Sequence, residues 1–390
     1  MRIIHIVPKP PYQGGLETLA GQLCEQLVER RHDVTWYCLN KLLRNRSKTR
    51  SKKGLIIKEF KPLFDDPFYI PSHDFLTELK QENADIIHVH NFHTLLPMLV
   101  IVFAKNLHAK IVLQPHYHVQ GQSFVRNMFL SFYKKLMKLI ILNFNVIVVN
   151  SKFERAVLIR DFPKISQKVI LVPEELSLGI PINIMWNPTK RPKKILYVGV
   201  LKKYKNVDVL IHAFKMLVPK KSSLELTIVG KGAQKEELVK LATNLGVGDD
   251  IVWKSDLTYN ELLKEYSEAS VVVHLSELES FSRVVHEAMA IGTPLVVYDH
   301  GALGALVKEG QAKGVTSLDP EKIADAIDAI IKNQWKPKKQ SIQLENKSYV
   351  DSIEKLYQNL LPKPITQKHS KNINTPLQNS SNCSLCLGEN

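Results

Sequence analysis

Residues 270–298 read SVVVHLSELESFSRVVHEAMAIGTPLVVY, and this stretch predicts the fold class of the chain. The runs at 270–275 and 294–298 are short, apolar and rich in valine, which is typical of buried strands. Between them, the apolar residues of 281–290 recur at three- and four-residue spacing, which favours a helix. A strand, a helix and a second strand in this order make one unit of a parallel α/β fold.

The same alternation extends over the rest of the chain, whose 390 residues suit two domains rather than one. We expect an α/β domain at 1–180, a proline- and lysine-rich linker at 181–193 and a second α/β domain at 194–345. A helix at 346–361 is expected to cross back to the first domain, and the polar segment 362–390 is expected to be a disordered tail. The other predicted strands lie at 2–8, 33–39, 54–60, 85–90, 110–114, 146–150, 169–172, 194–198, 224–229, 251–254 and 314–317.

The composition is that of an ordinary globular chain and excludes several classes of protein. With 44% hydrophobic and 23% charged residues, the chain is not disordered as a whole, collagen-like or a small disulfide scaffold. Four cysteines fit a reducing compartment, and Cys383 and Cys386 form a lone CxxC pair with too few ligands nearby for a zinc site. The longest apolar run, at 95–104, is well short of the ~20 residues that a membrane span needs. No signal peptide is recognisable, so we expect a cytoplasmic protein.

The formal net charge of +15 predicts an anionic partner. Part of this charge lies in 126–144, RNMFLSFYKKLMKLIILNF, which contains no acidic residue. The pattern fits an interfacial helix on an anionic membrane and, equally well, a core-facing helix with a solvated basic edge. No helix-turn-helix, RNP-type or zinc-finger pattern is present, so nucleic acid is not an expected partner. The candidate surface residues are Arg126, Lys134, Lys135 and Lys138.

Two glutamates in the opening stretch, Glu279 and Glu287, could flank a ligand. Glu279 falls in the loop before the predicted helix, and the first N–H groups of that helix, at Ser282, Arg283 and Val284, have no partner within it. Such a helix end is a natural seat for a phosphate, and carboxylates beside it suit sugar hydroxyls. The spacing alone fits equally well a helix with one exposed glutamate and a capping-like serine.

The motif E-x-F-[GS]-x-x-x-x-E-A-M-A-x-G-x-P at 279–294 resembles the signature of retaining glycosyltransferases with the GT-B fold, in particular glycosyltransferase family 4. Four other stretches are similar to that family in the same order: GGLE at 14–17, DIIHVHN at 85–91, ILYVG at 195–199 followed by Lys205 and Asn206, and IVGKG at 228–232. The resemblance covers roughly residues 1–360. It implies two Rossmann-like domains that face each other across a cleft.

The resemblance also implies roles for individual residues. Glu279 would lie against the donor sugar, and Glu287 would hold the ribose hydroxyls of the nucleotide. Lys205 would neutralise the diphosphate. His116 matches the histidine beside the transferred sugar, with His118 as the alternative. The remaining donor-binding candidates are Gly15, Gly199, Asp256, Leu257, Phe281, Ser282, Arg283 and Val284.

The implied activity is a retaining, hexosyl-type transfer from a nucleotide diphosphate-sugar to a glycan, a lipid or a lipid-linked acceptor bound by the first domain, at the inner face of a membrane. No Asp-x-Asp motif occurs, so no metal or other cofactor is expected. The histidines at 88, 90, 93, 116 and 118 are expected to be structural or sugar-contacting rather than metal ligands.

One departure from the family pattern bears on activity. Val200 stands where the family usually has an arginine, so a bidentate contact to the diphosphate is lost. Lys202, Lys203 or Arg283 could compensate. Without compensation, the chain would be a catalytically silent nucleotide-sugar-binding relative. The other alternative is a UDP-sugar epimerase with the same fold.

Overall fold

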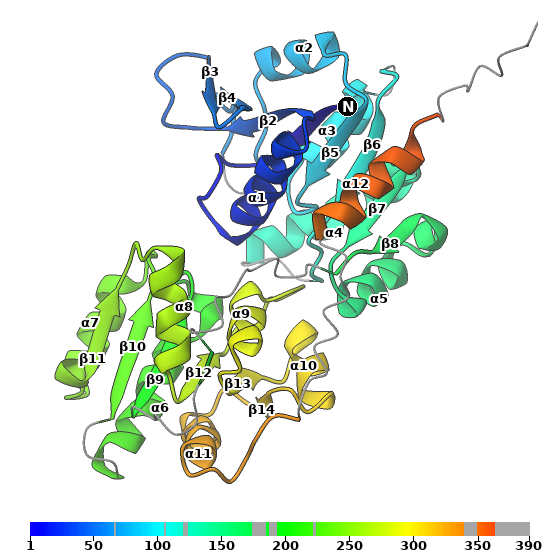
Figure 1. Ribbon diagram of the computed structural model, residues 1–390. Coiled ribbons are helices and arrows are strands. Elements are labelled where there is room, and N and C mark those ends of the chain that lie inside the picture. Colours follow the sequence, from blue (N-terminus) through cyan, green and yellow to red (C-terminus); the bar gives the residue numbers. More distant parts are fainter. Residues whose placement is uncertain are drawn as a thin grey trace, which may run out of the picture.

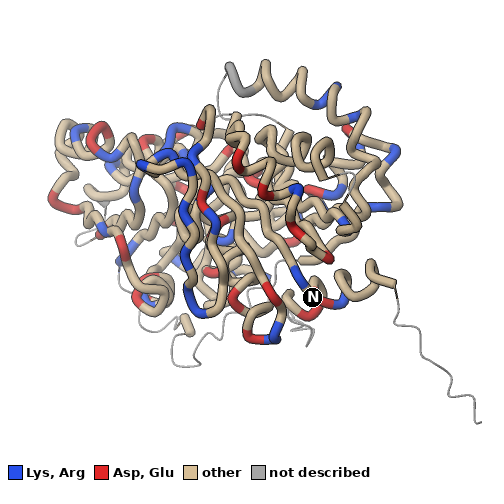
Figure 2. Tube along the Cα trace, turned by 90° about the horizontal axis from the view of Figure 1, so that it is seen from above, with Lys and Arg blue, Asp and Glu red and all other residues tan. Residues whose placement is uncertain are grey.

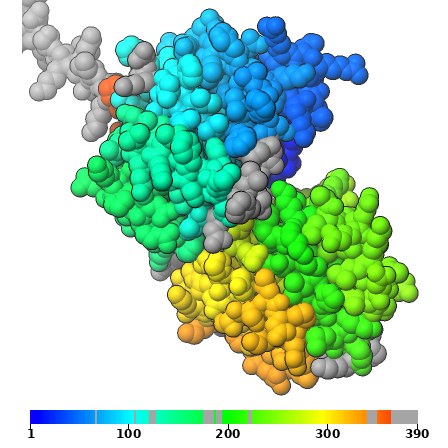
Figure 3. All heavy atoms as spheres, turned by 180° about the vertical axis from the view of Figure 1, so that it is seen from behind, coloured from blue at the N-terminus to red at the C-terminus, as the bar shows by residue number. Residues whose placement is uncertain are grey.

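The computed structural model describes residues 1–65, 68–104, 107–119, 124–173, 185–186, 193–220, 224–338 and 349–362. Most of the predicted linker, and the tail with Cys383 and Cys386, therefore lie outside the described residues. The described chain forms two α/β domains, which Figure 1 shows one above the other and Figure 3 shows as two lobes in contact.

The first domain is built on an eight-stranded sheet with the strand order β3-β4-β2-β1-β5-β6-β7-β8. Its strands are parallel except for the pair β3 and β4. The strands are β1 (Arg2–Ile6), β2 (Asp33–Leu39), β3 (Ser47–Lys52), β4 (Leu55–Phe60), β5 (Ile86–His90), β6 (Lys110–Gln114), β7 (Val146–Val149) and β8 (Val169–Leu171). The helices are α1 (Gly15–Glu29), α2 (His73–Gln81), α3 (Leu96–Ala104), α4 (Phe124–Ile140) and α5 (Lys152–Asp161).

The second domain is built on a six-stranded, wholly parallel sheet with the order β11-β10-β9-β12-β13-β14. The strands are β9 (Lys194–Val198), β10 (Glu225–Val229), β11 (Ile251–Lys254), β12 (Val271–His274), β13 (Leu295–Tyr298) and β14 (Lys313–Val315). The helices are α6 (Val207–Leu217), α7 (Lys235–Asn244), α8 (Tyr259–Glu268), α9 (Arg283–Ile291), α10 (Gly301–Lys308) and α11 (Pro320–Ile331).

Each sheet is covered on both faces, which is why its strands are almost continuously apolar. Two buried clusters pack on opposite faces of the first sheet, and two more pack on the second. The last helix, α12 (Tyr349–Leu360), follows the second domain in sequence and packs on the first sheet through Ile353 and Tyr357 (Figure 1). Arg30, the residue that follows α1, donates to Glu354 at 2.5 Å and ties α12 to the end of α1.

Each predicted strand is present, with ends displaced by at most two residues. The sequence pattern missed β3, because all six of its residues are exposed and polar or basic and it pairs only with β4 at the edge of the sheet. The helix expected at 281–290 begins instead at Arg283. Phe281 and Ser282 therefore belong to the turn that enters α9.

Candidate active site

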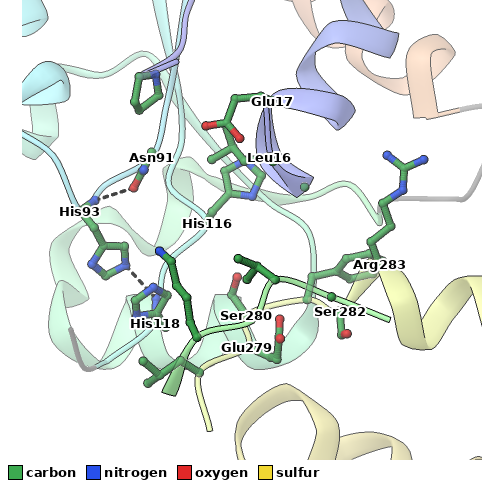
Figure 4. Close-up of a pocket in the computed structure, with 18 of the residues that line it drawn as sticks. Leu16, Glu17, Asn91, His93, His116, His118, Glu279, Ser280, Ser282 and Arg283 are labelled. Atoms are coloured by element: carbon green, nitrogen blue, oxygen red, sulfur yellow. Dashed lines mark hydrogen bonds between the residues drawn. The ribbon is translucent and has the colours of Figure 1, made fainter. Parts of the chain in front are cut away.

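A cavity of about 580 Å³ lies between the two domains and collects most of the predicted site residues (Figure 4). Its volume is typical of small-molecule sites. The first domain contributes residues from the loops after β1 and β6 and from the start of α1. The second contributes the loop after β9 and the turn into α9. The predicted residues in the wall are Gly15, His116, Gly199, Lys205, Glu279, Phe281, Ser282, Arg283 and Val284, and His118 lines it as well.

Glu279 is a buried carboxylate between two nitrogen donors. Its Oε1 lies 2.5 Å from Lys205 Nζ and 2.9 Å from His274 Nε2. Burial alone would raise the pKa of Glu279, but the charge of Lys205 and the hydrogen bond to His274 outweigh burial and lower the pKa to about 2. Glu279 therefore carries a full negative charge at neutral pH.

The position of Lys205 follows from the turn that holds it. Asn206 has a left-handed backbone, φ 54°, and its Nδ2 donates to the Leu275 carbonyl at 2.9 Å. The Glu277 N–H donates to the Tyr204 carbonyl at 3.1 Å. These two bonds tie the turn after β9 to the loop after β12, so Lys205 and Glu279 meet although 74 residues separate them.

The N-terminus of α9 faces the cavity with its first amides uncapped. Ser282 is the N-cap residue, but its side chain makes no capping hydrogen bond and lies 3.2 Å from His274 Nε2 instead. The alternative of a capping serine is therefore wrong. Arg283 and Val284, the first helical residues, line the cavity. This end of α9 can bind an anion through backbone N–H groups and the helix dipole.

Glu287 lies behind this helix end and not in the cavity wall. Only 3% of Glu287 is exposed, so the alternative of an exposed helix glutamate is also wrong. Tyr266 Oη donates to one carboxylate oxygen at 2.9 Å, and Arg283 Nε donates to the other at 2.8 Å. A ribose would reach Glu287 only by sharing or replacing these donors.

Two further donor-binding candidates also lie outside the wall. Asp256 follows β11, and its side chain is mostly exposed, 2.6 Å from Lys231 Nζ. Leu257 packs against the core of the second domain. The structure does not bring either residue to the cavity.

His116 sits at the carboxyl end of β6 with a strained backbone. Its φ is 47°, in the left-handed region that non-glycine residues rarely adopt. Its side chain is partly buried, its Nε2 atom has no hydrogen-bond partner among the described residues, and desolvation lowers its pKa to about 4. The nearby His118 donates its backbone N–H to His93 Nε2 at 3.2 Å and stacks on the His93 ring. His116 thus offers the cavity a neutral imidazole.

His88 and His90 belong to a histidine cluster under α12, and its other members, His5 and Tyr357, were not predicted. His5 in β1 is the parallel-strand partner of His88, and His5 Nδ1 lies 3.0 Å from His90 Nε2. Tyr357 Oη of α12 lies 2.6 Å from His88 Nδ1. The alternation of His88 and His90 along β5 was the available signal, but their partners come from distant segments.

Within the described residues, His5, His88 and His90 form the one group of three or more candidate metal ligands. One ring nitrogen from each lies within 4.8 Å of the others. The His5–His90 hydrogen bond accounts for this proximity without a metal, and no carboxylate belongs to the group.

Near Val200, the cavity retains other cations. Val200 lines the cavity and is 38% exposed. Of the three candidate replacements for the missing arginine, Lys203 points away and pairs with Asp208 at 2.7 Å. Lys202 and Arg283 both line the cavity.

The basic helix α4 differs from the prediction at one position. Lys134 Nζ lies 2.9 Å from Asp161 Oδ2 and 3.2 Å from the Val119 carbonyl, so this side chain is turned toward the protein. Lys135 and Lys138 are exposed, and the Arg126 side chain lies outside the described residues.

Comparison with known proteins places the chain in a family. A model of the group 1 glycosyl transferases matches residues 184–348, and a model of glycosyltransferase family 4 matches residues 13–174. The chain belongs to glycosyltransferase family 4. Within this family 4 chain, the two matches correspond to the second and the first domain.

Curated relatives of the family 4 chain align over part of its length. It is 33% identical to a D-inositol 3-phosphate glycosyltransferase of Frankia alni over 153 residues, 36% of this chain and 38% of that protein. It is 35% identical to an uncharacterized glycosyltransferase of Methanocaldococcus jannaschii over 144 residues, 37% of this chain and 36% of that protein. The chain thus spans less than two fifths of the length of these relatives.

Solved structures match the family 4 chain over nearly its whole length. The alignment with the structure of the Anabaena protein HepE, in complex with UDP and glucose, covers 93% of this chain and 100% of the HepE chain. Its TM-score is 0.68, and the two sequences are 16% identical. The alignment with a sucrose-phosphate synthase from Thermosynechococcus elongatus covers 92% of this chain and 98% of the synthase chain, with a TM-score of 0.67 and 18% identity. At these identities the likeness shows the fold alone, and it confirms the GT-B fold. No described helix has the length and apolar character of a membrane span.

Proposed function

We propose that the protein is a retaining glycosyltransferase that moves a hexose-type sugar from a nucleotide diphosphate-sugar to an acceptor in the first domain. One observation carries this proposal: Lys205, Glu279 and the uncapped end of α9 converge on one cavity wall, opposite His116 (Figure 4). A cation and the backbone amides of a helix N-terminus suit a diphosphate, and a charged carboxylate suits the hydroxyls of a sugar. The HepE and trehalose-6-phosphate structures that resemble this chain contain UDP or UDP-sugars, which favours a nucleotide-sugar donor.

In this reaction the diphosphate is the leaving group, and its developing charge must be stabilised. Lys205, together with the amides of Arg283 and Val284, can supply that stabilisation without a divalent ion. Lys202 provides a further positive charge beside Val200. We therefore propose that the transfer needs no metal and that Lys202 and Arg283 replace the missing arginine.

Retention of configuration follows if donor and acceptor meet on the same face of the sugar. The departing phosphate would accept the proton of the acceptor hydroxyl, so no enzymatic nucleophile is needed. His116, held neutral by burial, would contact the transferred sugar from the first domain. Closure of the two domains would exclude water and favour transfer over hydrolysis.

The outer face of α4 supports an acceptor at a membrane surface. Met128, Phe132 and Leu139 are each more than half exposed. Their spacing of four and seven residues puts them on one face of the helix, with Lys135 between them. Figure 2 shows the basic and acidic residues along the trace, and α4 contributes no acidic residue. Phe129 on the flank of α4 and Leu130 on its opposite side both line the cavity. One helix thus joins a basic, apolar outer surface to the acceptor side, which favours a lipid or lipid-linked acceptor on an anionic leaflet.

The test is an incubation of the pure protein with UDP-, GDP- and ADP-sugars, followed by NMR of the products. A glycosyltransferase releases the nucleoside diphosphate by slow hydrolysis, or by transfer when lipid extract is added. Binding without either reaction would favour the catalytically silent relative. Interconversion of the UDP-sugar without an acceptor would favour the epimerase.

A further inference from the structure

We propose that the first turn of α5 is a positioning element that holds the two sides of the catalytic site in register. Ser151 acts on the turn that carries Glu279, and Glu154 acts on the loop that carries His116. This inference rests on the proposed function for the roles of Glu279 and His116. The contacts themselves are independent of it.

Ser151 makes a hydrogen bond across the domain boundary. Its Oγ accepts from the Glu154 N–H at 3.0 Å, which caps α5, and donates to the Ser280 carbonyl of the second domain at 2.6 Å. Ser280 directly follows Glu279 and lines the cavity (Figure 4). The same hydroxyl therefore caps the N-terminus of α5 in the first domain and holds the turn that carries Glu279 in the second domain.

The start of α10 lies beside both α5 and the turn that carries Glu279. A Cβ atom on Gly301 would meet the Glu279 carbonyl at 3.3 Å and the Phe153 ring at 3.7 Å. Gly301 has a φ of 58°, which glycine adopts without strain, and it opens α10. The start of α10 thus lies next to both the Glu279 carbonyl and the aromatic ring of α5.

Glu154 secures the opposite wall of the cavity. Its side chain is buried, and it accepts from the Tyr117 N–H at 2.6 Å and from the Asn150 N–H at 2.8 Å. Tyr117 follows His116, whose left-handed backbone persists only where its surroundings impose it. Ser151 and Glu154 have the S-x-x-E spacing of a capping box, but this glutamate bonds to the β6 loop and to Asn150 rather than to the Ser151 N–H.

These contacts would make the alignment of the catalytic groups depend on whether the two domains are closed. If the domains separate, the Ser151–Ser280 bond breaks and the Glu279 turn loses its support from the first domain. If they close, one helical turn holds both Glu279 and the His116 loop. The catalytic groups are then aligned only in the closed state, which limits hydrolysis of the donor in the open state.

The alternative is that Ser151 only caps α5 and has no effect on the catalytic site. A variant that loses a helix cap elsewhere in the protein distinguishes this alternative from the proposal. Asp319 caps α11 in the second domain by accepting from the Glu321 N–H at 3.0 Å. Asp319→Ala removes a helix cap without touching the cavity. We expect both variants to lower the melting temperature because each loses one helix cap, and Ser151→Ala to lower it at least as much because it also loses the bond to Ser280.

The two variants differ in turnover with the nucleotide sugar that the protein accepts. We expect Ser151→Ala to lower kcat roughly tenfold, with the donor KM within about twofold, because it loses one hydrogen bond to the Glu279 turn. Asp319→Ala should keep both constants, and Ser151→Thr, which keeps the hydroxyl, should restore kcat. Equal kcat values for Ser151→Ala and Asp319→Ala would overturn the proposal.

Amide hydrogen exchange gives a readout that needs no substrate, so a failure of the proposed function leaves it valid. We expect faster exchange at 279–284 in Ser151→Ala than in the wild type or Asp319→Ala. Glu154→Gln should accelerate exchange at 116–118, because one of its two acceptor oxygens becomes a donor. Unchanged exchange at both segments would overturn the proposal whatever the enzymatic activity.

Discussion

Lys205 Nζ lies 2.5 Å from Glu279 Oε1, and each side chain is only 11% exposed. The cation proposed to bind the diphosphate is therefore paired with the carboxylate proposed to contact the sugar. In the proposed mechanism, a bound diphosphate would compete with Glu279 for Lys205. This competition would free the Glu279 carboxylate to accept hydrogen bonds from the sugar.

The first prediction concerns Glu279→Gln. We expect this variant to bind a nucleoside diphosphate several-fold more tightly than the wild type, because Lys205 no longer leaves a carboxylate and no negative charge opposes the ligand. Turnover should fall about a hundredfold, since the carboxylate that faces the sugar is lost. Calorimetric titration and rate measurements check the two effects. Weaker diphosphate binding in Glu279→Gln would contradict this account.

The second prediction separates the structural and binding roles of Glu287. Glu287→Ala leaves the buried Tyr266 hydroxyl and Arg283 without their acceptor, so unfolding free energy should fall by about 2–4 kcal/mol. Glu287→Gln keeps an acceptor oxygen and should retain most of that stability. Both variants should weaken nucleotide binding if Glu287 holds the ribose. Urea unfolding and titration provide the measurements, and unchanged nucleotide affinity in both would exclude the ribose role.

The third prediction distinguishes His116 from His118. Asparagine tolerates a positive φ better than most residues, so His116→Asn should fold with little loss of stability. It should lose most transfer activity while binding the nucleotide normally. His118→Asn is the matched control and should retain more activity. The reverse order of the two activities would show that His118 is the sugar-contacting residue.

The fourth prediction is a loss of stability in mild acid. Burial lowers the pKa of His5 to about 3 and of His116 to about 4, and it holds the pKa values of His88 and His90 well below their usual range. Because the unfolded chain takes up these protons near pH 6.5 and the folded chain does not, stability is full above about pH 6.5 and falls as the pH is lowered from there toward 4.

With all four histidines neutral in the fold, the unfolding free energy should fall by up to about 5 kcal/mol per pH unit at the steepest point. Urea unfolding at a series of pH values between 7.5 and 5 measures this slope. His88→Gln should make the slope less steep by one proton. A free energy that stays constant between pH 7 and 5 would contradict the burial of neutral histidines.

The fifth prediction concerns the exposed face of α4. The double variant Phe132→Ser and Leu139→Ser should reduce co-sedimentation with vesicles that contain phosphatidylglycerol. Lys135→Glu should weaken binding by about fivefold or more, and only at low salt, because a basic residue contributes about 1 kcal/mol at an anionic surface. Met216→Ser on α6 replaces an exposed apolar residue of the other domain and serves as the control. Equal vesicle binding by all variants would exclude α4 as the membrane surface.

The strands were predictable because parallel sheets covered on both faces leave a strong local pattern. Runs such as 146–150 and 194–198 are nearly all apolar, and turn residues bound them. The edge strand β3 left no such pattern, since its side chains all face solvent. The start of α9 was displaced by two residues, because Phe281 fits the apolar spacing of the helix but lies in the turn before it.

The sequence motifs predicted which residues line the site, but not which side chains those residues contact. The motifs identified Lys205, Glu279 and His116, which line one cavity. They could not reveal that Tyr266 and Arg283 hold Glu287, or that Lys134 pairs with Asp161, because these contacts depend on how separate helices pack. The bond from Ser151 to Ser280 spans 129 residues and two domains, so no local pattern predicts it.

Calorimetric titration of UDP, GDP and ADP in the presence of EDTA tests the central claim most directly. The account predicts that at least one of these diphosphates binds without a divalent ion, more tightly than its monophosphate, and that Lys205→Ala weakens this binding at least tenfold. Absence of binding by all three, a requirement for Mg²⁺, or equal affinity in Lys205→Ala would contradict it.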